Sequence, residues 1–138
     1  MPPVRAYVAL GSNLGNRQDN LALARERLAT LPGVVMRGES AVEETVPLGG
    51  LDQPMYLNQM LALDTTLSPR ELLAACQRIE ADAGGGPRAR WASRIIDLDI
   101  VRYGSLSLQE PDLIVPHPGI GHRDFWQREL AELERMGV

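Results

Sequence analysis

The sequence contains no lysine, because all 14 of its basic residues are arginine. A phosphate-binding loop with its lysine and a Schiff-base mechanism are therefore both excluded. The single cysteine, Cys76, rules out an internal disulfide. Its place in a helical pattern of apolar residues predicts a small buried side chain rather than a nucleophile. We therefore expect a protein of a reducing compartment.

Long apolar runs and an excess of positive charge are also missing. No stretch approaches the roughly 20 apolar residues that span a bilayer, and the N-terminal segment lacks the apolar core of a signal peptide. The net charge of −4 argues against a general nucleic-acid binder. We expect a cytoplasmic monomer with neither a membrane nor a nucleic-acid partner. Its length of 138 residues predicts a single domain over residues 1–138.

The spacing of the apolar residues predicts strands that alternate with amphipathic helices packed on a sheet. The predicted strands are 4–10, 34–44, 56–66 and 95–101. The predicted helices are 19–31, 68–82 and 121–136. The second helix has the clearest start, since Ser68, Pro69 and Glu71 supply an N-cap, a first-turn proline and a capping box.

Two aspartates interrupt the otherwise apolar strand 95–101. Asp97 and Asp99 are two residues apart, so a strand places both carboxylates on one face. Their mutual repulsion would be removed by a hard cation such as Mg²⁺. The alternative is an edge strand whose two aspartates face water.

An arginine-rich segment precedes this strand. Arg88, Arg90 and Arg94 offer planar guanidinium groups suited to phosphate oxygens, and Trp91 can stack on a flat ring. Three glycines and a proline at 84–87 are typical of a loop that closes over a ligand. A flexible connector would have the same composition.

Several other segments are candidates for binding. The turn at 11–16 contains glycines, which strand-to-helix turns use routinely, so it is weak evidence for a phosphate site. The connection 45–54 is long enough to be functional, although a plain surface loop has the same length. Tyr56 and Asn58 share one face of a strand, where they could bind a heterocycle or simply form its polar end.

The remaining candidates lie on the second helix and near the C-terminus. Gln77 and Glu80 are three residues apart on a helix, where solvation is the ordinary explanation. His117 stands between two prolines, which fix where its ring points, although a lone histidine is often structural. Arg123 and Phe125 begin the last helix, where an N-terminus favours anions.

In their order from Ala6 to Phe125, these motifs resemble the 6-hydroxymethyl-7,8-dihydropterin pyrophosphokinases of folate biosynthesis. The matching motifs are Gly11-Ser12-Asn13-Leu14-Gly15, Pro47-Leu48-Gly49, Asp52-Gln53-Pro54, Tyr56-Leu57-Asn58, Gln77-Arg78-Ile79-Glu80, Arg90-Trp91 with Arg94, Asp97-Leu98-Asp99-Ile100, and Val115-Pro116-His117-Pro118 with Arg123 and Phe125. Each motif alone is weak, but their joint order and spacing are specific. The resemblance implies a ferredoxin-like α+β fold, a single domain with a mainly antiparallel sheet flanked by helices.

The resemblance also implies a reaction: the transfer of diphosphate from ATP to the hydroxymethyl oxygen of the pterin, with AMP as the other product. Asp97 and Asp99 would hold two Mg²⁺ ions and act in catalysis together with Arg88 and Arg94. The implied pterin-binding residues are Gly11, Thr45, Leu48, Tyr56, Asn58, Trp91 and Phe125. The implied ATP-binding residues are Gln77, Glu80, Arg88, Trp91, Arg94, Ile100, His117 and Arg123.

The chain departs from the family pattern in two segments. The arginine loop is shorter, with glycines in place of polar sequence, and Ala92-Ser93 stands where Gly-Pro is usual. Residues 126–130 replace an apolar, proline-containing continuation. Besides the diphosphotransferase, two hypotheses remain: a related transferase for another heterocyclic alcohol, and a ligand-binding or regulatory domain without catalysis. The intact aspartate pair favours an enzyme.

Overall fold

The structure is a computed structural model that describes residues 2–47, 53–83 and 95–138. Its main sheet contains β1 (Val4–Ser12), β2 (Val34–Glu39), β3 (Glu43–Thr45), β4 (Tyr56–Thr65) and β5 (Asp97–Tyr103). The strand order is β2-β4-β1-β5, with β3 paired to β4, and every pairing is antiparallel. A separate hairpin joins β6 (Leu108–Glu110) to β7 (Leu113–Val115).

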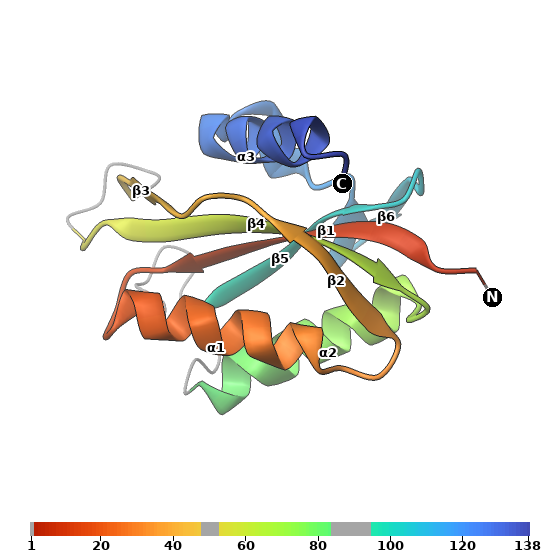
Figure 1. Cartoon of the computed structure of the whole chain (residues 1–138), viewed down its shortest axis with the longest axis horizontal. Helices are drawn as coiled ribbons and strands as arrows, with labels where there is room; N and C mark the ends of the chain where they lie inside the picture. Colours follow the sequence, from red (N-terminus) through yellow and green to blue (C-terminus); the bar gives the residue numbers. More distant parts are fainter. Residues whose placement is uncertain (1, 48–52, 84–94) are drawn as a thin grey trace.

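The helices lie on both faces of the main sheet (Figure 1). Helices α1 (Arg17–Ala29) and α2 (Pro69–Asp82) cover one face, and α3 (Asp124–Arg135) covers the other, after the short 3-10 helix η2 (Pro118–Gly121). The expected α+β domain with a mainly antiparallel sheet is confirmed. Apart from the short β3, the elements of this domain follow one another as β1-α1-β2-β4-α2-β5. No helix within the described ranges is long and apolar enough to cross a membrane.

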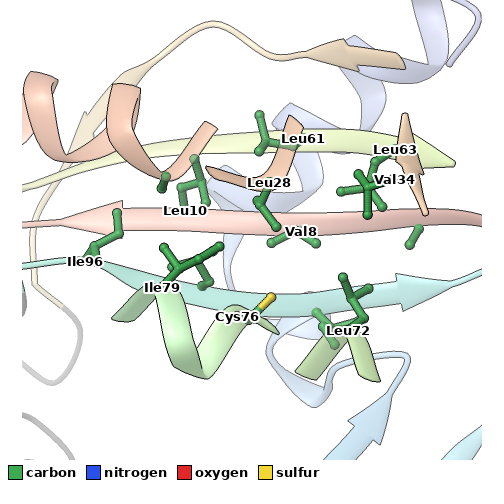
Figure 2. Close-up of a cluster of buried hydrophobic side chains, with 14 of the residues drawn as sticks. Val8, Leu10, Leu28, Val34, Leu61, Leu63, Leu72, Cys76, Ile79 and Ile96 are labelled. Carbon is green, nitrogen blue, oxygen red and sulfur yellow. The ribbon is translucent and has the colours of Figure 1, made fainter. Parts of the chain in front are cut away.

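Two apolar clusters result from the period of two along the central strands. Figure 2 shows the larger cluster, in which Val8 and Leu10 of β1 meet side chains of α1 and α2. Cys76 is fully buried in it, and burial raises the pKa of its thiol to about 12. The prediction that Cys76 packs as an unreactive hydrophobe is therefore confirmed. On the opposite face, Ala9 and Met60 pack with residues of α3.

The starts of α1 and α2 follow from local capping. The Asn16 side chain accepts a hydrogen bond from the Asp19 amide at 3.1 Å. Ser68 and Glu71 form the complete capping box that the sequence predicted. A cap of this kind contributes about 0.5–2 kcal/mol to helix stability.

The structure differs most from the prediction in three segments. The predicted strand 34–44 is broken after β2, because buried Ser40 accepts the Met60 amide through its hydroxyl and interrupts the regular ladder. The last helix begins at Asp124 rather than residue 121, since η2 occupies the preceding residues. The β6–β7 hairpin lies in a segment for which no strand was predicted.

Candidate active site

A cavity of about 120 Å³ lies on the α3 face of the sheet, at the end where β1 leads into α1. Eight of the residues implied by the resemblance line it: Gly11, Thr45, Tyr56, Asn58, Asp97, Asp99, Arg123 and Phe125. They come from β1, β3, β4, β5 and the start of α3. The structure therefore brings together residues that are up to 114 positions apart in the sequence.

The antiparallel register explains this convergence. Gly11 of β1 is paired with Asn58 of β4 on one side and with Asp97 of β5 on the other. In the next row toward the sheet centre, Ala9 is paired with Asp99. Residues of one row point to the same face of a sheet, so the carboxamide and both carboxylates share the cavity.

Gly11 is needed in this row because the side chains of Asn58 and Tyr56 occupy the space beside its Cα atom. A Cβ atom at this position would lie 3.3 Å from Asn58 Oδ1 and 3.4 Å from Tyr56 Cδ1. The first distance is tighter than ordinary van der Waals contact, and the second is at its lower limit. A larger residue would therefore displace the carboxamide and the ring that line the cavity.

Asn58 is held in place by β3. Its side chain is buried, and Asn58 Nδ2 donates a hydrogen bond to Thr45 Oγ1 at 2.5 Å. A carboxamide has two N–H donors and one acceptor oxygen, so Asn58 can bind Thr45 and the amide edge of a ring at the same time. The cavity thus combines a polar edge with the aromatic side chains of Tyr56 and Phe125.

The two aspartates have small residues beside them on β1, namely Gly11 and Ala9. This arrangement leaves space next to both carboxylates. Within the described ranges, no group of three or more histidine, cysteine or acidic side chains could hold a metal by itself. Two carboxylates are suited to Mg²⁺, which commonly takes the other ligands of its coordination shell from water and substrate phosphates.

Asp99 also lines a second cavity of about 230 Å³. This cavity lies along β5, between α2 and β7, and its lining includes Ile100 and His117. Two N–H groups approach Asp99: His117 Nε2 lies 4.0 Å from Asp99 Oδ1, and the guanidinium nitrogen Arg123 Nη1 lies 3.9 Å from Asp99 Oδ2. Asp99 therefore stands where the two cavities meet.

The orientation of His117 follows from its neighbours. The His117 amide donates to the Val101 carbonyl at 2.9 Å, and His117 Nδ1 accepts the Gly119 amide at 2.9 Å. In the neutral ring the proton is therefore on Nε2, the atom that faces Asp99. Burial lowers the pKa of His117, with Asp99 opposing that shift and Arg123 and His122 adding to it. The neutral ring is thus a fixed N–H donor at the junction.

Trp126 of α3, which was not among the candidate site residues, is 2% exposed and lines the first cavity. Its ring packs edge-on against His117, with ring centres 4.8 Å apart. The Arg123 guanidinium lies over the same ring, 4.3 Å from its centre. Trp126 therefore contacts both His117 and Arg123. The sequence signal was its position next to Phe125 and one turn after Arg123.

Two of the implied ATP-binding residues line neither of these cavities. Gln77 is exposed on α2, one turn after Leu73, which lines the second cavity. Glu80 Oε2 accepts the Leu98 amide at 2.8 Å, so Glu80 fixes β5 against α2. Four other candidates, Leu48, Arg88, Trp91 and Arg94, lie outside the described residues, as does the predicted closing loop.

Comparisons with known proteins place nearly the whole chain in one family. A model of the 7,8-dihydro-6-hydroxymethylpterin-pyrophosphokinase family matches residues 7–135. Three relatives carry the name 2-amino-4-hydroxy-6-hydroxymethyldihydropteridine pyrophosphokinase. The relative from Methylorubrum extorquens is 40% identical over 94% of this chain and 82% of its own length. The relative from Bacillus subtilis is 39% identical over 93% and 77%, and that from Pseudomonas aeruginosa is 40% identical over 94% and 80%.

Proposed function

Because the chain belongs to the 7,8-dihydro-6-hydroxymethylpterin-pyrophosphokinase family and is a diphosphokinase of folate biosynthesis, we propose that it transfers diphosphate from ATP to the hydroxymethyl oxygen of 6-hydroxymethyl-7,8-dihydropterin. That oxygen bonds to the β-phosphorus of ATP while the bond from this phosphorus to the α,β-bridging oxygen breaks. The products are AMP and the pterin diphosphate. The reaction needs no covalent intermediate on a side chain, so the protein contributes positioning and charge neutralisation.

The pterin occupies the first cavity in this proposal. Tyr56 and Phe125 both line it, and a flat ring between them would stack on two aromatic side chains. Asn58 reads the amide edge of the ring while Thr45 keeps the carboxamide oriented. The backbone near Thr45 and Leu48 adds contacts, and Trp91 completes the site.

The nucleotide occupies the second cavity, beside Ile100. His117 donates from Nε2 to a phosphate oxygen, and Arg123 adds positive charge on the same side. Two Mg²⁺ ions held by Asp97 and Asp99 would neutralise the phosphates in transit. We further assign phosphate contacts to Arg88 and Arg94, and nucleotide contacts to Gln77, Glu80 and Trp91.

One observation supports this proposal most strongly: Asp99 lines both cavities. A group that passes from one substrate to the other must cross their junction. The carboxylate of Asp99 can hold metal ions at that junction, and the N–H groups of His117 and Arg123 can bind the highly charged diphosphate.

The test is AMP formation from ATP, Mg²⁺ and the pterin, measured by chromatography. The wild type should form AMP and pterin diphosphate in equal amounts, and Asp99→Asn should form neither. Asp64→Asn is the matched control, because Asp64 is an aspartate of the same sheet outside both cavities. Pterin binding without AMP formation would support the non-catalytic binding domain instead. AMP formation only with another heterocyclic alcohol would support the related transferase.

We propose that residues 1–138 form one pterin pyrophosphokinase domain that acts as a monomer in the cytoplasm. Its partners would be the two small substrates, without nucleic acid. Size-exclusion chromatography coupled to light scattering tests the monomer.

A further inference from the structure

Two glutamates with buried carboxyl oxygens lie where α3 meets β3. Glu129 is buried as a whole, whereas the side chain of Glu43 is 30% exposed and only its Oε1 atom is buried. Glu129 of α3 is 2% exposed, and both of its carboxylate oxygens are buried without a hydrogen-bond partner among the described residues. The same holds for Oε1 of Glu43 in β3. Arg128, next to Glu129 in α3, reaches Glu43 Oε2 at 3.3 Å, so the buried oxygens of the two glutamates belong to elements in contact. Two ionised carboxylates only accept hydrogen bonds, so a hydrogen bond between Glu43 and Glu129 requires a proton on one of them.

The surrounding charges do not neutralise the pair. Arg128 Nη2 lies 3.3 Å from Glu43 Oε2. Glu132, one turn along α3, contributes a further carboxylate, which accepts the Ala41 amide at 2.8 Å. One guanidinium therefore faces three acidic groups. Burial, followed by the nearby Glu43, raises the pKa of Glu129 to about 9.

The pair joins the two sides of the first cavity. Glu43 is paired with Asn58 in the β3–β4 register, two residues before Thr45, which binds Asn58. On the helix, Glu129 lies one turn after Phe125, which lines the cavity. A bond between Glu43 and Glu129 thus connects the strand that orients the carboxamide with the helix that carries the aromatic ring.

We propose that Glu43 and Glu129 share one proton across the α3–β3 contact, and that this acid–carboxylate pair positions the two walls of the pterin cavity. The positioning role rests on the proposed function, whereas the shared proton does not. Loss of the proton would leave two adjacent negative charges, which repel and separate α3 from β3.

The shared proton makes folding depend on pH in a defined direction. An unfolded glutamate loses its proton near pH 4.5, whereas folded Glu129 keeps it up to about pH 9. The unfolded state therefore binds fewer protons in this window, and stability falls as the pH rises. For one proton, the unfolding constant increases about tenfold per pH unit.

Urea unfolding between pH 5.5 and pH 8.5 tests the shared proton, with Glu129→Gln as the variant. Glutamine keeps a donor for Glu43 and cannot ionise. The ratio of wild-type to Glu129→Gln unfolding constants should rise about tenfold per pH unit. Glu134→Gln, an exposed position on the same helix, is the matched control and should keep the wild-type slope. A ratio that does not change with pH would overturn the proposal. It would do so even if a bound cation, rather than a proton, neutralised the two carboxylates.

Infrared spectroscopy of the wild type tests the shared proton without any substitution. A protonated carboxylic acid has a carbonyl band distinct from that of a carboxylate. This band should be present at pH 7 and disappear as the pH rises above about 9. Its absence at pH 7 would show that both glutamates are ionised, which overturns the proposal.

Pterin binding tests the positioning role. Between pH 8 and pH 10 the pterin Kd of the wild type should rise more steeply than that of Glu129→Gln, by up to tenfold per pH unit above pH 9. Parallel curves, with the infrared band present, would overturn the positioning role alone. A protein that binds no pterin at any pH would instead refute the proposed function, and the unfolding and infrared results would still decide the shared proton.

Discussion

The contact between Thr45 and Asn58 allows the pterin site to be tested apart from the nucleotide site. Thr45→Val is nearly isosteric and removes only the hydroxyl that accepts the Asn58 Nδ2 hydrogen bond. Because Asn58 is 6% exposed, its Nδ2 cannot recover this bond from bulk water without moving. We therefore expect the carboxamide to turn away from its orientation toward the ring.

The magnitude follows from burial. A buried donor left without its partner costs about 1–3 kcal/mol, so the free energy of unfolding should fall by that amount. When the pterin is bound, the misoriented carboxamide leaves the ring edge without its partner as well. A penalty of about 1–3 kcal/mol corresponds to a pterin Kd raised about 5- to 150-fold. Thr45 does not line the second cavity, so the ATP Kd should change less than about twofold.

The assay is calorimetry with each ligand separately, combined with urea unfolding, on a double-mutant cycle of Thr45→Val and Asn58→Ala. If Thr45 acts through Asn58, then Thr45→Val should add little pterin loss to the Asn58→Ala variant. Two results would refute the reasoning. One is an equal loss of ATP and pterin affinity, and the other is a large loss of stability with unchanged pterin binding. Either would mean that this hydrogen bond supports the fold rather than the ring.

Three further predictions concern the same sheet. Asp99→Asn should abolish turnover without lowering the melting temperature of the metal-free protein, because it removes like-charge repulsion; a large drop in melting temperature would mark Asp99 as structural. Gly11→Ala should raise the pterin KM while leaving the circular dichroism spectrum unchanged, since its Cβ would crowd Asn58 Oδ1 at 3.3 Å; unchanged kinetics would contradict this. Finally, hydrogen bonding to Arg5 lowers the pKa of Asp64 below 3.8. The ionised carboxylate therefore stabilises the fold above pH 3.8, and this stabilisation is lost as the pH falls through the lowered pKa. Acid unfolding of Asp64→Asn should lack that loss, and an acid transition identical to that of the wild type would show that the pair contributes nothing.

Local features of this protein could be predicted because they depend on neighbours in the sequence. The period of two placed Asp97 and Asp99 on one face, and Ser68 and Glu71 marked the start of α2. Both rest on contacts within one element, which residue type and spacing largely determine. The burial of Cys76 followed from the same kind of pattern.

The arrangement of these elements was decided only by the tertiary structure. The antiparallel register placed Gly11 between Asn58 and Asp97, and no local period specifies which strands become neighbours. The break at Ser40 depends on a hydrogen bond to Met60, 20 residues away. Such contacts form only when distant segments pack together.

The role of Trp126 and the Glu43–Glu129 pair show the same limit. Each residue alone has an ordinary local explanation, a buried helix residue for Trp126 and a solvated charge for either glutamate. The chemistry of the glutamates arises because α3 packs on the sheet with Arg128 reaching Glu43 of β3, which brings together groups 86 residues apart in the sequence. Burial then changes what those groups do, since a carboxyl group removed from water must find a partner or keep its proton.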